Sequence, residues 1–335
     1  MFRYRISTAK TPGLATVAFL KDWGYFYYMS GKIFELDIDY TSCLSATDNF
    51  VSIPNSQYSA NLGYGSGTFS APLLRRSDKK ECTYQFTIPK TVNPPVFLYY
   101  KLTSFYQNHR RYVKSFDSNQ LSGKARSVSD LSGGDCEPLA VREIKGVTKP
   151  IYPCGLIANS QFNDTFSNLV RAESGGEYVF GEDDISWASD RARYGKTEYS
   201  NSDVYPPPNW DERYKDGYTD KNPIPDLSTD YHLQVWMRTA ALPVFRKLYG
   251  INNSDPLTPT TYSMKIGYNF DTTTYGGEKH FIISTTSAFG GRNPIIGIFY
   301  MAVGCLSILI GIVLVTRQLY KPRSLGDLSS LTWNR

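Results

Sequence analysis

The sequence predicts a membrane protein with a mainly antiparallel β (α+β) ectodomain, long loops and a C-terminal transmembrane helix. Three observations lead to this fold class. Residues 294–315 contain no charged side chain; as a helix they would span about 33 Å, enough to cross a hydrocarbon core of about 30 Å. The chain has 26 Tyr and 18 Phe, residue types that favour strands. Four cysteines precede the apolar segment, an even number that suits disulfides.

The composition favours one span and one sizeable folded domain. Of the 335 residues, 41% are hydrophobic and 20% are charged, which is too polar for a multi-span transporter. The net charge of +5 arises from 36 basic and 31 acidic residues without a dominant block. This balance describes a solvated surface and gives no support for nucleic-acid binding.

The residues before the apolar segment predict an ectodomain stabilised by disulfides. Its four cysteines are Cys43, Cys82, Cys136 and Cys154. No pair has Cys-x-x-Cys spacing and the chain has only three histidines, so we expect no metal site. Of the three possible connectivities, the sequential one, Cys43–Cys82 with Cys136–Cys154, closes the shortest loops and is favoured. Each bond would contribute about 3–4 kcal/mol and would require an oxidising compartment.

Two further patterns place the ectodomain on the lumenal or extracellular side. The Asn-x-Ser/Thr glycosylation pattern occurs at Asn163 and Asn252 in polar surroundings. Basic residues follow the apolar segment, namely Arg317, Lys321 and Arg323. By the positive-inside rule, residues 316–335 form a cytosolic tail and residues 34–293 form the ectodomain.

Residues 1–33 form an atypical N-terminal segment. Their apolar run, residues 14–20, barely reaches the minimum length for a signal peptide, and no small-x-small cleavage site follows it. As a membrane span, the segment would place Lys21 and Asp22 near mid-membrane, at about 2.5–3.5 kcal/mol each. A first transmembrane helix is therefore not convincingly present.

Alternating apolar residues predict strands at 34–40, 84–88, 262–270 and 279–285. Helical spacing is weaker, and it predicts helices within 102–116 and within 242–250. In the second of these, Pro243 lies near the start and Gly250 occupies the C-cap position. Long polar and Pro-rich loops separate these elements, notably at 205–226.

No catalytic constellation accompanies this fold. The chain has no Gly-x-Ser-x-Gly elbow, His-Glu-x-x-His motif or phosphate-binding loop. Its histidines, His109, His232 and His280, lie far apart in the sequence. We therefore expect neither an enzyme nor a cofactor. A single-span cell-surface recognition or adhesion receptor with a β-rich ectodomain is an alternative that fits the same features.

Two basic clusters are candidate partner contacts. One contains Arg110 and Arg111 among aromatic residues, and the other contains Arg238 and Arg246 close to Trp236 and Phe245. Such clusters suit acidic lumenal loops of a partner or lipid headgroups. A solvated basic face whose aromatic residues lie in the core explains the same pattern.

The apolar segment carries a ridge of small residues. Gly297, Gly304 and Gly311 recur every seven residues, and Ser307 extends the ridge. Because close packing drives helix association in lipid, the ridge predicts contact with a partner helix. The frequency of glycine in membrane helices is the alternative explanation. A leucine in place of Gly304 is expected to weaken co-purification with the partner.

Five long stretches resemble one family in the same order: "FYQNHRRYVKSF", "YPCGLIANSQFNDTF", "VWMRTAALPVFRKLYG", "STTSAFGGRNPIIGI" and "KPRSLGDLSSLTWNR". The chain is similar from residue 34 onward to the cell division control protein 50 family, the accessory (β) subunits of phospholipid flippases, which are type IV P-type ATPases. This resemblance implies a non-enzymatic partner in a heterodimer with the catalytic subunit, in contact with membrane lipids. It also implies a glycan at Asn163, with a looser match at Asn252, and the sequential disulfide pairing.

The same resemblance implies two membrane spans with both tails in the cytosol. Family members escort the catalytic subunit out of the endoplasmic reticulum and support its phosphorylation cycle, and the pair moves aminophospholipids to the cytosolic leaflet. The location would be the endoplasmic reticulum, the Golgi and endosomal system or the plasma membrane. Residues 1–32 depart from the family pattern, which has its first span there, and we hypothesise an altered 5′ exon. Phe289 stands where the family usually has Trp.

Overall fold

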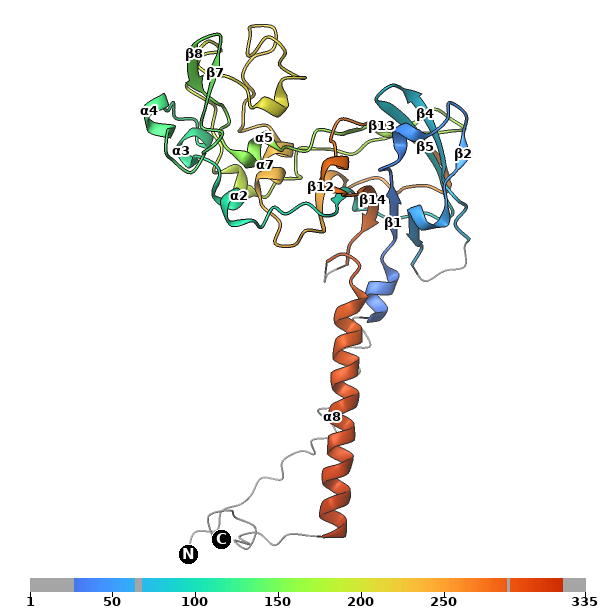
Figure 1. Cartoon of the computed structure of the whole chain (residues 1–335). Coiled ribbons are helices and arrows are strands. Elements are labelled where there is room, and N and C mark those ends of the chain that lie inside the picture. The colour runs from blue at the N-terminus through green and yellow to red at the C-terminus, as the bar shows by residue number, and fades with distance from the viewer. Residues whose placement is uncertain (1–26, 64–67, 288–289, 322–335) are drawn as a thin grey trace, which may run out of the picture. The chain divides into compact units, whose positions relative to one another are not determined.

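The computed structural model describes residues 27–63, 68–287 and 290–321 (Figure 1). The chain divides into two compact units. One is the ectodomain unit, Phe34–Thr285, and the other contains the residues before and after it. The expected N-terminal tail and first span fall mostly on residues 1–26, which lie outside the described part of the chain.

The first sheet of the ectodomain contains two of the predicted strands as direct neighbours. All its strands are antiparallel, in the order β12-β6-β14-β1-β3. They are β1 (Glu35–Asp39), β3 (Tyr58–Asn61), β6 (Val96–Leu102), β12 (Phe245–Asn252) and β14 (Lys279–Thr285). Ile38 of β1 lies opposite Phe281 of β14, and both side chains are buried.

The second sheet contains the other two predicted strands. Its order is β11-β10-β13-β5-β4-β2, and β9 also pairs with β13. The strands are β2 (Val51–Ser52), β4 (Leu73–Asp78), β5 (Glu81–Ile88), β9 (Thr165–Phe166), β10 (Leu169–Arg171), β11 (Glu177–Tyr178) and β13 (Thr260–Gly267). The four predicted strands and the mainly antiparallel β fold class are therefore confirmed.

The remaining part of the ectodomain contains short helices and long loops. We call residues 106–162 and 183–244 the loop lobe, and the two sheets the sheet lobe (Figure 1). The elements of the loop lobe are α2 (Arg110–Lys114), α3 (Ser118–Leu121), α4 (Val128–Leu131), β7 (Val141–Ile144), β8 (Val147–Pro150), α5 (Leu156–Asn159), α6 (Ala188–Arg191), η3 (Pro208–Trp210) and α7 (Tyr231–Met237). The sheet lobe has three 3₁₀ turns, η1 (Cys43–Ser45), η2 (Asn55–Gln57) and η4 (Thr273–Tyr275).

The predicted helix within 242–250 is wrong, because most of this segment forms the edge strand β12, which pairs with β6. Gly250 is not a C-cap. It lies in the strand, where a Cβ atom would come within 2.7 Å of the Cβ of Phe180. The helix predicted within 102–116 is restricted to α2, because Leu102 belongs to β6.

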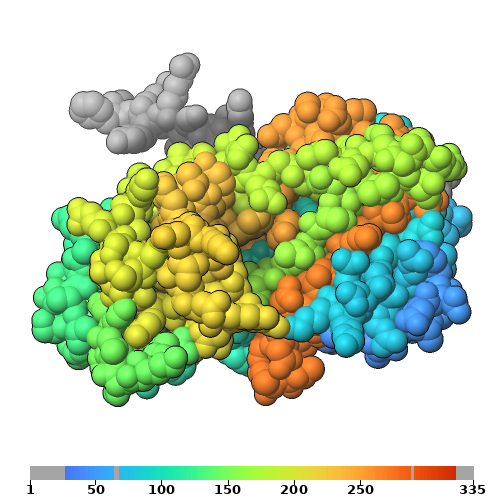
Figure 2. All heavy atoms as spheres, turned by 90° about the horizontal axis from the view of Figure 1, so that it is seen from above, coloured from blue at the N-terminus to red at the C-terminus, as the bar shows by residue number. Residues whose placement is uncertain are grey.

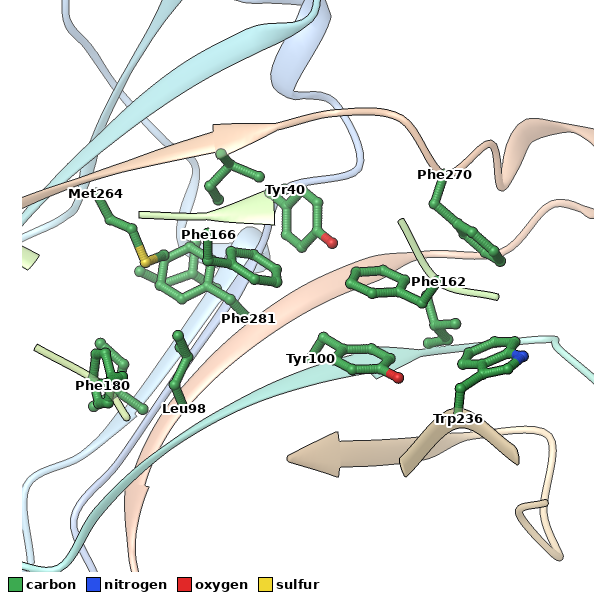
Figure 3. Close-up of a cluster of buried hydrophobic side chains, with 14 of the residues drawn as sticks. Tyr40, Leu98, Tyr100, Phe162, Phe166, Phe180, Trp236, Met264, Phe270 and Phe281 are labelled. Carbon is green, nitrogen blue, oxygen red and sulfur yellow. The ribbon is translucent and has the colours of Figure 1, made fainter. Parts of the chain in front are cut away.

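Aromatic side chains fill the space between the two sheets and continue into the loop lobe (Figure 3). Phe281 of the first sheet lies 6.1 Å from Phe86 of the second, measured between ring centroids. Tyr100 stacks on Phe162 at 3.9 Å, and Trp236 of α7 lies beyond them at the loop-lobe end of the cluster. The buried aromatic side chains of the ectodomain thus build one continuous core, and each such pair adds about 0.5–1.5 kcal/mol beyond area burial.

Both disulfides lie in the ectodomain. The Cys43–Cys82 bond joins η1 to β5 and spans 39 residues of sequence. The Cys136–Cys154 bond spans 18 residues and lies in a second, smaller apolar cluster. This cluster consists of Leu131, Cys136, Ala140, Ile151 and Cys154.

The second unit contains the predicted membrane helix. Helix α8 (Pro294–Tyr320) has 27 residues and continues past the predicted end at residue 315. Among the described residues it is the one helix that is long and apolar enough to cross a membrane. Residues 27–32 are also helical, and the Ser30 hydroxyl accepts a hydrogen bond from the Asn293 backbone N–H at 3.0 Å.

Candidate partner-binding site

Two of the four predicted arginines line one groove of the ectodomain. Arg238 directly follows α7, Arg246 lies on the edge strand β12, and the groove between them has a volume of about 650 Å³. Arg110 and Arg111 lie on α2 with exposed side chains and do not line this groove. The structure therefore separates the two basic clusters that the sequence predicted.

A buried lysine holds one wall of this groove in place. Lys247 of β12 is 7% exposed, and its ammonium donates to the backbone carbonyls of Val235, Trp236 and Arg238 at 3.0, 2.6 and 2.7 Å. These carbonyls belong to the last turn of α7, which lacks intrahelical donors. Burial, with a smaller effect of Arg238, holds the pKa of Lys247 well below its usual range. The lysine thus fixes α7, and with it the backbone of Arg238, against β12.

Each groove arginine is held by one carboxylate and one aromatic ring. Arg238 lies 3.2 Å from Asp190 and 5.2 Å from the ring centroid of Trp187, a side chain that is 67% exposed. Arg246 lies 2.9 Å from Glu35 and 5.1 Å from the Tyr99 centroid. Because a guanidinium has five N–H donors, each arginine retains donors for a further acceptor.

The groove also contains an unsatisfied hydroxyl. Ser186 is 3% exposed, and its Oγ has no hydrogen-bond partner within the described part of the chain. A buried hydroxyl without a partner is destabilising by about 1–3 kcal/mol. The exposed ring of Trp187, two guanidinium groups and this hydroxyl together suit a peptide segment that carries both apolar and carboxylate side chains.

Sequence reasoning missed Ser186, Trp187 and the buried position of Lys247. Trp187 interrupts a polar stretch, "DDISWASDR", and a large apolar residue in a loop was the available indication. Nothing in the sequence distinguishes the buried Lys247 from the exposed Arg246 beside it. Only the pairing of β12 with β6 and the position of α7 make that distinction.

The two glycosylation candidates, Asn163 and Asn252, differ in the exposure and the hydrogen bonding of their side chains. Asn163 is exposed, and its side chain makes no hydrogen bond to any described residue. Asn252 is 6% exposed, and its amide donates to the carbonyl oxygen of Val179 at 2.9 Å and accepts from the backbone N–H groups of Ser254 and Asp255. A sugar on Asn252 would disrupt this buried network, whereas Asn163 is accessible.

A buried ion pair lies beside Asn163. Asp164 and Lys279 are both fully buried, with Nζ 2.7 Å from Oδ2. Asp164 also accepts from the Tyr40 hydroxyl and from the backbone N–H groups of Asn269 and Phe270. Burial lowers the pKa of Lys279 to about 8, and the charge of Asp164 opposes this shift. These bonds fix the position of the backbone next to Asn163.

The glycine ridge of α8 lies partly against the chain itself. A Cβ atom on Gly297 would come within 3.0 Å of the Tyr27 Cβ and 3.1 Å of its backbone, and Gly304 is also buried. No described residue lies within 4 Å of a Cβ atom placed on Gly311. The Ser307 hydroxyl donates to the Val303 carbonyl of its own helix at 2.9 Å. The Gly297 end of the ridge therefore serves packing within this chain.

The three histidines lie in separate surroundings. His280 lies 2.7 Å from Asp37, His232 lies 3.1 Å from Glu182, and His109 is the exposed N-cap residue of α2. Within residues 27–63, 68–287 and 290–321, no group of three or more His, Cys, Asp or Glu side chains could hold a metal ion.

These features define a class of protein: a membrane protein with a disulfide-bonded β ectodomain and a groove suited to protein contact. Residues 26–324 match the model of the LEM3 (ligand-effect modulator 3) family / CDC50 family. The chain belongs to this family.

Three relatives match most of the chain. The phospholipid-transporting ATPase accessory subunit CDC50 of Chaetomium thermophilum is 39% identical over 92% of this chain and 81% of its own length. The phospholipid-transporting ATPase accessory subunit LEM3 of Saccharomyces cerevisiae is 35% identical over 96% of this chain and 80% of its own length. Cell cycle control protein 50B of Homo sapiens is 37% identical over 86% of this chain and 81% of its own length.

Proposed function

We propose that this protein is a non-catalytic accessory subunit of a phospholipid-transporting ATPase and forms a heterodimer with the catalytic subunit. The observation that carries this proposal is the similarity over nearly the whole chain to relatives named as such accessory subunits. The alternative of a recognition or adhesion receptor has no support among these relatives.

We further propose the class of the catalytic partner and its lipid substrate. The partner is a type IV P-type ATPase that moves aminophospholipids to the cytosolic leaflet. The accessory subunit assists the folding of its partner, its exit from the endoplasmic reticulum and its transport cycle. The pair then resides in the Golgi and endosomal system or the plasma membrane. The two disulfides support this assignment, because they require an oxidising compartment.

We propose the following arrangement in the membrane. Residues 34–293 form the lumenal or extracellular ectodomain, 294–315 cross the hydrocarbon core, and 316–335 form a cytosolic tail. Arg317 in the last turn of α8 supports the orientation, because positive charge favours the cytosolic side. Residues 1–33 precede the ectodomain and take the place of the family's cytosolic tail and first span.

Within the ectodomain, the groove between Arg238 and Arg246 binds an acidic lumenal loop of the catalytic subunit. The exposed Trp187 supports this proposal, because Trp and Arg dominate the energetics of protein interfaces. The exposed arginines of α2, Arg110 and Arg111, form a second contact with the same partner. In the membrane, the open Gly311 end of the ridge is the surface available to a partner helix.

Co-expression of the full chain with a phospholipid-transporting ATPase catalytic subunit tests this function. We expect the two to co-purify, and we expect the accessory subunit to increase export of the ATPase and its phosphoenzyme level. An ATPase whose export, phosphoenzyme level and purification are all unaffected by this chain would contradict the assignment.

A double variant then tests the groove. Arg238→Ala with Arg246→Ala removes both guanidinium groups and should reduce co-purification by about tenfold or more, because interface hot spots contribute about 2 kcal/mol or more. The matched control is Arg75→Ala with Arg76→Ala, which removes two charges from exposed positions on β4. Equal co-purification of the two double variants would exclude the groove as a contact.

A further inference from the structure

A second hollow of the ectodomain lies beside the exposed Asn163. Its volume is about 740 Å³, within the range of small-molecule sites. Segments from 161–165, 225–232 and the neighbourhood of residue 212 line it. In Figure 2, the surface is hollowed between the yellow and the lime-green parts of the chain, which correspond to these regions.

The lining of this hollow combines carboxylates with aromatic rings. The side chains of Glu182 and Glu212 are 54% and 62% exposed. Tyr231 and Tyr249 are half-buried, and the His232 ring lies 4.5 Å from that of Tyr249, measured between centroids. Carboxylates accept hydrogen bonds from hydroxyl and amide groups, and aromatic faces offer flat apolar surface.

The charges in the hollow exclude an anionic ligand and favour a neutral, hydroxyl-rich one. Five carboxylates line it, those of Asp164, Glu182, Glu212, Asp226 and Asp230, against the single guanidinium of Arg213. Asp164 is paired with the buried Lys279 and Glu212 with the exposed Lys80, which leaves the lining acidic. A phosphate group would be repelled by this set of charges. No metal-binding cluster of His, Cys, Asp or Glu occurs here or elsewhere in the described residues.

The position of Asn163 connects the hollow to a ligand of this kind. Asn163 lines the hollow, its amide is free to carry a sugar, and the hydroxyl-bearing Thr165 of the Asn-Asp-Thr pattern is exposed beside it. The backbone between them is fixed, because Asp164 is held by Lys279 and because Asn269 donates to the Asn163 carbonyl at 3.1 Å. A glycan on Asn163 would therefore begin at a defined point on the rim.

We propose that the hollow binds the first N-acetylglucosamine residues of a glycan attached to Asn163 of the same chain. The covalent link gives these sugars a local concentration of a few millimolar, so an intrinsic Kd of about 1 mM suffices to keep them bound most of the time. The bound sugars bridge 161–165 to 225–232, and thereby connect the strand region to the loop preceding α7. This inference rests on the proposed function only in placing the ectodomain in a glycosylating compartment.

The test uses the full chain, expressed in a glycosylating eukaryotic host and purified in detergent. Mass spectrometry of the Asn163 peptide first measures occupancy. Peptide N-glycosidase F then releases the glycan from the folded protein, and the release rate is compared between the parent and Glu182→Ala with Glu212→Ala. Bound sugars are shielded, so we expect release from the parent to be about fivefold slower than from the double variant.

The matched control is Glu143→Ala with Glu173→Ala, which removes two exposed carboxylates that do not line the hollow. It should release the glycan at the parent rate. As a second measurement, hydrogen exchange in 225–232 should rise after deglycosylation of the parent and stay unchanged in the Glu182/Glu212 variant. An unoccupied Asn163, or equal release rates in all three proteins, would overturn the proposal. Co-purification with the ATPase, measured on the same samples, reports separately on the proposed function.

Discussion

The sheet lobe and the loop lobe satisfy their backbone groups in different ways. In the sheet lobe, β13 and β5 pair over eight consecutive residues, from Thr260 opposite Ile88 to Gly267 opposite Glu81. In the loop lobe, single side chains bond to the backbone instead. Three indole or phenol groups do so, in the pairs Trp210 with Ala158, Trp236 with Ile157 and Tyr218 with Tyr152.

This difference predicts where the ectodomain is vulnerable. A strand ladder distributes its stability over many equivalent bonds, so only a buried charge or a core ring is critical there. In the loop lobe, each side-chain bond or disulfide holds a segment that has no ladder of its own. Substitutions should therefore act globally in the sheet lobe and locally in the loop lobe.

The largest effect is expected from breaking the buried ion pair of the sheet lobe. Asp164→Asn or Lys279→Met leaves the other partner buried without its counter-charge, so each should lower the free energy of unfolding by about 3–5 kcal/mol. This loss corresponds to a fall in Tm of about 6–20 °C. Thermal unfolding of the full chain in detergent measures it.

The exposed pair Arg76–Asp48 provides the control, since Asp48→Asn should change Tm by no more than a few degrees. The double variant Asp164→Asn with Lys279→Met should lose less free energy of unfolding than the sum of the losses in the two single variants. Strict additivity would show that the two charges do not act as a pair.

The second effect concerns the Cys136–Cys154 disulfide of the loop lobe. Replacing both cysteines by serine should lower the free energy of unfolding by about 3 kcal/mol, because an 18-residue loop is released in the unfolded state. The second cluster contains only five buried residues, so hydrogen exchange should rise mainly in 127–155. The matched Cys43/Cys82 variant should raise exchange across both sheets, and an equally local effect there would contradict the comparison.

The sequence predicted the sheet lobe far better than the loop lobe, and the reason is physical. Strands such as β1 and β14 bury alternate side chains, so their period is visible in the chain itself. The loop lobe is positioned by distant pairs that no local pattern records. Gln120, for example, donates to the Ile151 carbonyl and accepts from the Cys154 N–H.

The candidate site shows the same limit, because local sequence patterns do not record contacts between distant segments. Arg238 and Arg246 were predicted as candidate contacts because both lie close to aromatic residues in the sequence, and the structure places both on one groove. The predicted helix within 242–250 was wrong because Phe245 and Leu248 satisfy helical spacing as well as strand pairing. Their strand conformation depends on β6, which lies about 150 residues earlier in the chain.

The third effect separates the two Asn-x-Ser/Thr positions. Asn163→Gln should remove a glycan and increase electrophoretic mobility, and its direct effect on packing should be small because the side chain is exposed. Asn252→Gln should leave mobility unchanged and lower the free energy of unfolding by about 1–3 kcal/mol, because it disturbs a buried hydrogen-bonded amide. A mobility shift in the Asn252 variant would show that this position is modified before it is buried.

The smallest effect is a pH dependence on the surface of the first sheet. Asp37 of β1 lies between His280 at 2.7 Å and Lys101 at 2.5 Å. Burial acts to raise the pKa of Asp37, but the hydrogen bond and positive charges of His280 and Lys101 outweigh it, so the pKa is lowered. The stabilisation is therefore present above the unfolded pKa of about 4 and is lost as the pH falls through the lower folded value.

Asp37→Asn should remove this pH dependence. Because the Asp37–His280 pair is partly exposed, the variant should lower the free energy of unfolding near neutral pH by at most about 1 kcal/mol. Unfolding measured from pH 7 down to pH 3 should show a shallower acid slope for the variant than for the parent. An unchanged slope would mean that other carboxylates dominate the acid response. Asp37, Lys101 and His280 lie on the neighbouring strands β1, β6 and β14. Even this smallest effect should therefore spread across the sheet, whereas loop-lobe changes of similar size should stay local.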